Sequence, residues 1–273
     1  MEPGIDVSHW DGLIDWARVA AAGVKFSYAK ASEGSGYTDD TLGANIRGAA
    51  ASGVLTGAYH FYRLAASPES QAQRFLDSIK GLPWDLPPSL DFEEETAQSQ
   101  AEVARVLKRW ADLVETGCGR RPIIYSSAYF WNTFVGSASA SWANDYGLWV
   151  ANYGSTIPML PKVWNSWQFW QYSDKGRVSG ISSDVDLDWF AGTEAELYAL
   201  AGKEVPGPVE GKLLATVLVD RLRMRETPGG EIAGFMAPGS ELEILETRSA
   251  GGITWGRFDG WMAIDPAYCK IKK

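Results

Sequence analysis

Four acidic side chains crowd into the stretch PSLDFEEE, residues 88–95, after a proline-led apolar approach. Alternate side chains of a β-strand share a face, so Asp91 and Glu93 are expected to point the same way. Carboxylates that lie close together raise one another's pKa, and an acid that stays protonated near neutral pH can protonate a glycosidic oxygen. The pair therefore indicates acid–base chemistry. Glu94 and Glu95 fit a solvated loop, or an acidic approach to the next helix, where the helix dipole favours negative charge.

Further acids occur in two other strand-like stretches of the sequence. Asp6 lies in GIDVSHW, and Asp184, Asp186 and Asp188 lie in DVDLDWF. In parallel barrels the catalytic groups come from the C-terminal ends of the strands. If these stretches are the first and last strands of such a barrel, their acids meet those of PSLDFEEE at one end. A carboxylate cluster of this kind is typical of divalent-metal binding or of glycoside hydrolysis.

Aromatic residues near the same strand ends favour the second chemistry, because flat rings can stack on sugars. They are Trp10, Tyr59, Phe61, Tyr125, Trp149, Trp170, Tyr172 and Trp189. The chain has only two histidines, which leaves little material for histidine-based catalysis. His60 alternates with two of the aromatics and is expected to face the helices as a structural residue.

Elements able to position these side chains alternate between strands and helices up to about residue 200. Strands are expected at 3–8, 24–31, 54–63, 87–95, 121–127, 147–153, 166–173 and 184–190. Helices are expected at 13–23 and 39–53, from Ser67 and from Ser99, where Ser99 and Glu102 have capping-box spacing. Repeated strand–helix units predict a parallel sheet. Eight strands favour a small α/β barrel of the (β/α)₈ type with reduced later helices, and an open doubly wound sheet is the alternative.

The sequence changes character after residue 202. Residues 203–212, KEVPGPVEGK, have the composition of a linker, and 213–273 contain short strands separated by Pro-Gly and Gly-Gly turns. We expect domains at 1–202 and 213–273, the second a small all-β barrel. The charge supports this division, because the part after residue 206 is neutral and the first 206 residues hold the whole net charge of −9.

The composition of the 273-residue chain also bears on its partners. A net charge of −9 argues against a nucleic-acid-binding protein, which normally has a basic surface. No apolar run approaches the length of a membrane span, and the start lacks the pattern of a signal peptide. Cys118 and Cys269 lie far apart and are expected to be free, buried thiols. We expect a monomer with no cofactor, no metal, no membrane partner and no nucleic-acid partner.

Seven ordered motifs resemble glycoside hydrolase family 25, the lysozymes (N-acetylmuramidases) of bacteria, fungi and phages. They are GIDVSHWDG, YAKASEG, GAYHFYR, LDFEEE, LWVANYG, WQFWQYS and DVDLDWF, between residues 3 and 192. The resemblance implies an irregular TIM-like (β/α)5(β)3 barrel, five β/α units followed by three strands. It also implies cleavage of the β-1,4 bond between N-acetylmuramic acid and N-acetylglucosamine in bacterial cell-wall peptidoglycan.

The same resemblance assigns roles to particular residues. Glu93 would be the general acid, Asp91 would orient the substrate N-acetyl group or stabilise its charge, and Asp6 and Asp186 would complete the catalytic set. Substrate binding is expected at Tyr59, Phe61, Tyr125, Trp149, Trp170, Glu33 and Asp188. Phe92 replaces a smaller aliphatic residue of the family pattern, and we expect only repacking there.

The spacing of the two acids leaves the mechanism open. Residues two apart on a strand are separated by about 6.6 Å, which lies between the carboxylate separations of retaining and inverting glycosidases. Retention assisted by the substrate N-acetyl group and direct attack by Asp91 both remain possible. A catalytically inactive wall-binding protein and a chitin-type hydrolase are the alternative functions.

Residues 213–273 resemble a bacterial SH3-like domain. RLRMRETPGGEIAGFMAPGSELEILE followed by WGRFDGWMAI fits that module's L-x-x-R-x-x-P pattern and its late Gly-Trp. In this setting such domains usually bind the cell wall, although the fold alone would also allow a passive appendage. The location of action is expected to be outside the cell, as a secreted enzyme or as a phage endolysin released by a holin.

Overall fold

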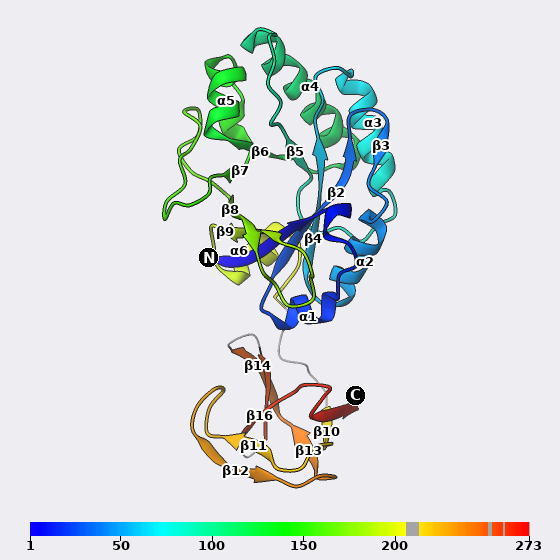
Figure 1. The fold of residues 1–273 in the computed structure, drawn as a ribbon, viewed down its shortest axis with the longest axis vertical. Helices are drawn as coiled ribbons and strands as arrows, with labels where there is room; N and C mark the ends of the chain where they lie inside the picture. Colours follow the sequence, from blue (N-terminus) through cyan, green and yellow to red (C-terminus); the bar gives the residue numbers. More distant parts are fainter. Residues whose placement is uncertain (206–212, 251–252, 259, 273) are drawn as a thin grey trace. The chain divides into compact units, whose positions relative to one another are not determined.

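The computed structural model describes residues 1–205, 213–250, 253–258 and 260–272. The chain divides into two compact units (Figure 1). The first comprises Met1–Ala20 and Val24–Lys203, and the second is built on Glu204–Lys273. The linker predicted at 203–212 lies mostly outside the described residues.

Eight strands of the first unit form a closed barrel. They are β1 (Glu2–Val7), β2 (Phe26–Glu33), β4 (Leu55–Phe61), β5 (Ser89–Asp91), β6 (Ile123–Ser127), β7 (Leu148–Ala151), β8 (Phe169–Gly176) and β9 (Val185–Phe190). The strands pair in this order, and β1 closes the ring by pairing with both β2 and β9. A short strand, β3 (Tyr37–Thr38), pairs with the end of β2. The predicted barrel is confirmed, and the open sheet is excluded.

Helices follow each of the first five strands of the ring and none separates the last three. They are α1 (Trp16–Ala21), α2 (Leu42–Ala51), α3 (Pro68–Ile79), α4 (Gln100–Cys118) and α5 (Ala128–Phe134). Short 3₁₀ turns occur at His9–Asp11, Gly136–Ser139 and Ala143–Asp145. A further helix, α6 (Glu194–Leu200), follows β9 and was not predicted. The order agrees with five β/α units followed by three strands.

The helix starts follow the predicted capping chemistry in part, because the predicted capping box of α4 is only half formed. Ser67 caps α3 with proline in its first turn, and the Ser99 hydroxyl accepts a hydrogen bond from the Glu102 amide at 3.3 Å. The Glu102 carboxylate pairs with Arg105 instead of returning to the cap. Helices α3 and α4 then pack side by side on the outside of the barrel (Figure 1).

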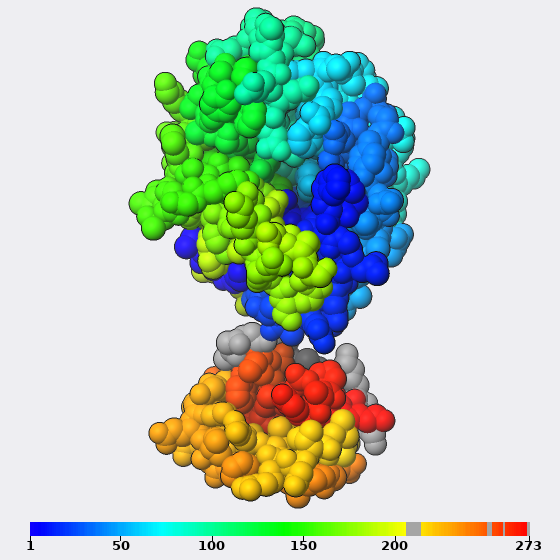
Figure 2. Space-filling model, in the orientation of Figure 1, coloured from blue at the N-terminus to red at the C-terminus, as the bar shows by residue number. Residues whose placement is uncertain are grey.

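The last strand of the barrel runs against the expected parallel direction. Strand β9 is antiparallel to both β8 and β1. Only residues 177–184 connect β8 to β9, and a parallel crossover needs a dozen residues or more. The beginning of β9 therefore lies where the parallel strands end, which places Asp186 opposite Asp6 in the register. Figure 2 shows the first residues of the chain (blue) beside this late segment (yellow-green).

The barrel interior changes from apolar to acidic along its axis. We call the end where the parallel strands finish the mouth, and the opposite end the base. Toward the base, a cluster of large side chains fills the barrel, among them Phe26, Tyr28, Trp149 and Phe169. The fit requires glycine, because a Cβ on Gly4 would lie 2.3 Å from the Phe26 ring. Side chains at the same inward phase near the mouth are mostly polar or charged, and they include the carboxylates of Asp6, Asp91 and Asp186.

The second unit contains only β-strands among its described residues. They are β10 (Leu213–Val217), β11 (Leu222–Arg225), β12 (Ile232–Met236), β13 (Glu241–Ile244), β14 (Glu246–Ala250), β15 (Ile253–Arg257), β16 (Trp261–Ala263) and β17 (Cys269–Lys272). They form a three-stranded and a five-stranded sheet around a small core that includes Val217, Ile244 and Met262. In the described parts of both units, no helix is long and apolar enough to cross a membrane.

Candidate active site

A pocket of about 190 Å³ opens at the mouth of the barrel. Four predicted acids line it although they are far apart in the sequence: Asp6, Asp91, Glu93 and Asp186. Asp6 lies near the end of β1, Asp91 ends β5, and Asp186 lies near the beginning of β9. Glu93 lies two residues beyond β5 and still lines the pocket. The structure thus gathers the predicted catalytic residues in one place.

Glu93 and Asp91 have strongly perturbed ionisation. Burial, followed by the charge of Asp186, raises the pKa of Glu93 to about 7. Burial, followed by the charge of Glu93, raises the pKa of Asp91 well above its usual range. One Asp91 oxygen, Oδ1, is buried without a hydrogen-bond partner among the described residues. Glu93 can therefore hold a proton near neutral pH in a pocket that it shares with Asp91.

The side chain of Gln171 connects the acids on the other side of the pocket. Its amide nitrogen donates to Asp6 Oδ2 at 2.6 Å and to Asp186 Oδ2 at 3.2 Å. Its amide oxygen accepts from the Tyr125 hydroxyl at 2.7 Å and the Tyr153 hydroxyl at 2.6 Å. Burial and the neighbouring Asp186 raise the pKa of Asp6, whereas the hydrogen bond from Gln171 lowers it. Burial also raises the pKa of Asp186 to about 6.

Asp188 lies deeper in the barrel than the other acids. It is completely buried, and its Oδ1 accepts a hydrogen bond from the indole of Trp149 at 2.8 Å. Burial raises its pKa well above the usual range. The predicted substrate-binding residue Asp188 does not line the pocket, because the register places it opposite Gly4, two residues deeper than Asp6. It instead supports Trp149, which does line the pocket.

The predicted aromatic residues divide between the two faces of the strands. Tyr59, Phe61, Tyr125 and Trp149 line the pocket, as does Trp10, whose side chain is 81% exposed. Trp170 lies on the outer face of β8, where its indole donates to the Asn152 carbonyl, because Gln171 takes the inward phase. Two other aromatics of the sequence prediction, Tyr172 and Trp189, stack on each other at 5.4 Å. These three residues are outside the pocket lining.

Glu33, which was predicted to bind substrate, forms ion pairs with neighbouring basic side chains instead. Its carboxylate pairs with Lys30 Nζ at 2.6 Å and with Arg63 at 2.7 Å, and it does not line the pocket. These pairs lower the pKa of Glu33 although burial opposes them. Lys30 lines the pocket, and its positive charge lowers the pKa of both Asp91 and Glu93.

Three predictions for residues outside catalysis are confirmed, one of them only in part. His60 is buried on the helix side, contacts Ser32 and Gln71, and has a pKa lowered by burial to about 4. Both cysteines are free as predicted, but only Cys269 is buried, whereas Cys118 is half-buried. Glu94 and Glu95 belong to the loop before α4, where they accept hydrogen bonds from the Leu64 amide and the Tyr129 hydroxyl.

Sequence reasoning missed Gln171, Lys30 and Tyr153. Strand alternation could have placed Gln171 and Lys30 inward. Gln171 is two residues from the inward Phe169 on β8, and Lys30 is two residues from the inward Tyr28 on β2. Tyr153 follows β7 in a loop, so strand alternation could not place it. Among the described residues, no three His, Cys, Asp or Glu side chains are arranged to hold a metal ion.

Comparisons with known proteins agree with this geometry. The model of the glycosyl hydrolases family 25 matches residues 5–181. The chain belongs to this family. Lysozyme M1 of Streptomyces globisporus is 40% identical over 208 residues, which cover 72% of this chain and 70% of that protein. The autolytic lysozyme of Clostridium acetobutylicum is 32% identical over 259 residues, which cover 93% of this chain and 76% of that protein.

A solved structure shows the same barrel. The bacterial lysozyme of Streptomyces coelicolor superposes with a TM-score of 0.69 at 39% identity, covering 73% of this chain and 96% of that one. This family 25 chain is therefore a glycoside hydrolase of the lysozyme and muramidase family, whose substrate is peptidoglycan.

Proposed function

We propose that this family 25 enzyme cleaves the β-1,4 bond between N-acetylmuramic acid and N-acetylglucosamine, with Glu93 as the general acid. The observation that carries the assignment is the position of Glu93 in a pocket it shares with Asp91 and an aromatic wall, where burial and the charge of Asp186 raise the pKa of Glu93 to about 7. Such an acid is protonated at neutral pH and loses its proton readily as the glycosidic bond breaks.

Asp91 is proposed to act on the 2-acetamido group of the muramic acid sugar. Glu93 gives its proton to the leaving oxygen while the acetamido carbonyl oxygen attacks the anomeric carbon, which forms an oxazolinium ring. The ring carries a positive charge, which favours the ionised form of Asp91 against the effect of its burial. Water then attacks the same carbon and gives its proton to the Glu93 carboxylate. The product retains its anomeric configuration.

Glu93→Gln tests the acid assignment. We expect turnover of purified walls to fall about a thousandfold, within the range for loss of a general acid, with the melting temperature preserved. Glu95→Gln is the matched control two residues away, because Glu95 is exposed and contacts only the Tyr129 hydroxyl among its described partners. Equal activity of the two variants would contradict the assignment.

The products of the unmodified enzyme test the bond and the stereochemistry. Mass analysis of released fragments should show N-acetylmuramic acid at the reducing end, and proton NMR should show the β-anomer first. A covalent sugar on Asp91 in trapping experiments would replace substrate assistance with direct attack by Asp91. Efficient cleavage of chitin oligomers in preference to peptidoglycan would favour the chitin-type alternative.

We further propose that the second unit, over 213–273, is an SH3-like wall-binding domain of a monomer that acts outside the cell that makes it. Support comes from its two small sheets and its compact β core. The barrel unit alone corresponds to 96% of the Streptomyces coelicolor chain, so a chain ending at Lys203 should fold. That truncated chain should cleave soluble fragments normally and sediment with intact walls several-fold less. Unchanged sedimentation would contradict a wall-binding role.

A further inference from the structure

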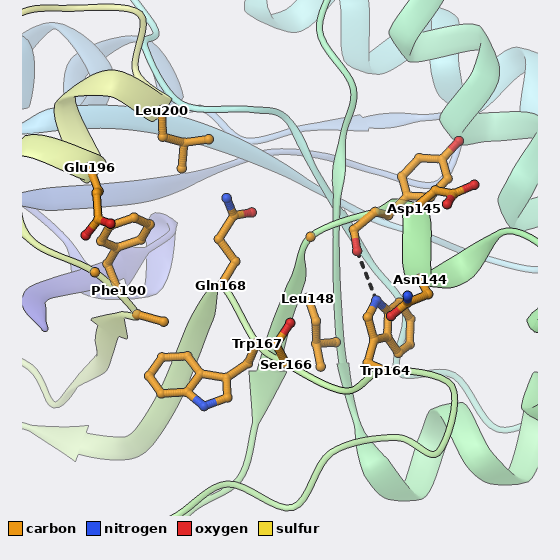
Figure 3. A pocket seen from close by; sticks show the side chains of 14 residues that line it. Asn144, Asp145, Leu148, Trp164, Ser166, Trp167, Gln168, Phe190, Glu196 and Leu200 are labelled. Carbon is orange, nitrogen blue, oxygen red and sulfur yellow. Dashed lines mark hydrogen bonds between the residues drawn. The ribbon is translucent and has the colours of Figure 1, made fainter.

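A second and larger pocket, of about 550 Å³, lies at the base of the barrel (Figure 3). Its lining residues precede β8, lie before or at the first residue of β7, lie at or after the last residue of β9, or belong to α6. Strands β7 and β8 enter the barrel here, and the antiparallel β9 leaves it here. The pocket is therefore at the opposite end from the catalytic acids and shares no lining residue with them. It cannot be a subsite of the catalytic pocket.

The half-buried side chain of Gln168 lines this pocket. Its backbone N–H donates to the Leu148 carbonyl at 2.7 Å, and its backbone carbonyl accepts from the Ala191 amide at 2.9 Å. A Cβ on Gly147 would lie 2.0 Å from Gln168 Oε1, so the side chain occupies space that only glycine leaves open. No side-chain hydrogen bond satisfies this half-buried amide among the described residues. An amide that reaches a pocket can donate to and accept from a ligand at the same time.

Aromatic surface adjoins this amide. The half-buried Trp167 lines the pocket, and its ring is held edge-to-face against Trp170 at 5.9 Å. The Trp164 indole is fixed by donating to the Tyr146 carbonyl at 2.9 Å, which is the dashed line in Figure 3. Figure 3 shows Trp167 and Phe190 on one side of the pocket and Trp164 on the other, with Leu148 and Gln168 between them. Trp164 and Phe190 are almost completely buried, so Trp167 is the ring among these three that can offer a face, and such a face next to an amide suits a sugar ring.

The charge of the pocket selects among ligands. None of its 14 lining residues is lysine or arginine, while Asp145 and Glu196 contribute carboxylates and Asn144 contributes a second amide. Carboxylates repel anionic groups and accept hydrogen bonds from hydroxyls. The pocket therefore fits an uncharged, hydroxyl-rich molecule better than a phosphate or a carboxylate.

We propose that the base pocket is a second saccharide-binding site for uncharged N-acetylhexosamine units. Its assignment to glycan of the wall rests on the proposed function, while its preference for neutral sugar rests on the lining alone. A polymer substrate that is bound at the base stays near the enzyme between cleavage events, which raises the effective concentration of bonds at the mouth.

Calorimetric titration with a tetrasaccharide of N-acetylglucosamine tests the site in the Glu93→Gln protein, which keeps the ligand intact. Adding Trp167→Ala or Gln168→Leu to Glu93→Gln should remove one bound tetrasaccharide per chain. Trp84→Ala is the matched control, because Trp84 is a half-buried tryptophan on the loop before β5, at the same end of the barrel but outside the pocket. It should leave the stoichiometry unchanged. A Trp167→Ala protein that binds as many tetrasaccharides as its parent overturns the proposal.

Turnover by the otherwise unmodified enzyme gives a second readout. Trp167→Ala and Gln168→Leu should clear insoluble walls at least threefold more slowly and cleave soluble fragments at the normal rate. Equal losses on both substrates would mean a structural role and would overturn the proposal. Failure of the muramidase proposal is seen separately, in the products of the unmodified enzyme, and does not alter the count of bound tetrasaccharides.

Discussion

The same strands build the mouth and the base half of the barrel interior, but their inward side chains are aromatic at the base and polar or charged at the mouth. Along β2 the inward side chains change from Phe26 to Tyr28 to Lys30, and along β8 they change from Phe169 to Gln171. Aromatic rings exclude water from the base half, so the carboxylates above them border a poorly polar floor. Burial is accordingly the first cause of every raised carboxyl pKa at the mouth. The aromatic base half thus contributes to the burial that raises the pKa values of the acids at the mouth.

Phe169→Ala should have the largest effect on the contrast between mouth and base, because it opens a cavity in the aromatic cluster below the acids. Phe169 is fully buried and contacts the rings of Phe26 and Tyr28. We expect the free energy of unfolding to fall by about 3–5 kcal/mol, as is usual for such truncations. In the surviving folded protein, water below the acids should lower the pKa of Glu93 and move the high-pH limb of activity to lower pH. Chemical denaturation and a pH–rate profile measure the two effects.

Phe134→Ala is the control for this change, since Phe134 is only half-buried on α5. It should cost less stability and leave the pH profile in place. A Phe169→Ala profile identical to that of the unmodified enzyme would show that the aromatic cluster does not set the ionisation of the acids.

Gln171→Leu removes the polar connection at the mouth while keeping a similar volume. It deletes a donor to Asp6 and an acceptor for two tyrosine hydroxyls, and hydrogen bonds to charged groups are each worth about 1.5–3 kcal/mol. We expect kcat/KM to fall about ten- to a hundredfold. Because the bond from Gln171 lowers the pKa of Asp6, its loss should also move the low-pH limb upward.

Tyr153→Phe removes only one of the four hydrogen bonds of the Gln171 side chain, so it shows how much of the Gln171→Leu effect comes from that single bond. Its effect on kcat/KM should be smaller, with the low-pH limb unchanged. If Gln171→Leu keeps the normal kcat/KM, Gln171 does not position the acids.

The pH dependence of the unmodified enzyme should show the smallest of these effects. The folded protein raises the pKa of Glu93 to about 7 from an ordinary value of 4.5, so it holds a proton that the unfolded chain has lost in this range. The free energy of unfolding should therefore fall as pH rises from about 4.5 to 7, and the slope should be shallower in Glu93→Gln. Activity should decline as pH rises through about 7, because the general acid becomes ionised. Stability that rises across this window would contradict the raised pKa.

Much of the active site could be predicted because strand alternation is a local property. Alternation along the predicted strand placed Asp91 and Glu93 inward, and position near a strand end placed Asp6 and the aromatic residues Tyr59, Tyr125 and Trp149. Trp170 was misplaced because its stretch contains six aromatics or amides in succession, and the phase there was settled only by packing. Glu33 was assigned from its motif, and only the fold showed that Lys30 and Arg63 neutralise it.

The sequence by itself determined the barrel, its five β/α units and the acids that meet in it, because periodicity, caps and motifs are written in neighbouring residues. The tertiary structure alone decided the direction of β9, the hydrogen-bond connection through Gln171 and the pocket at the base. Each of these depends on residues distant in the chain, as in the contact of Gln171 with Asp6 across 165 positions. The ionisation of Glu93 also belongs to the tertiary structure, since burial and the charge of a distant aspartate produce it.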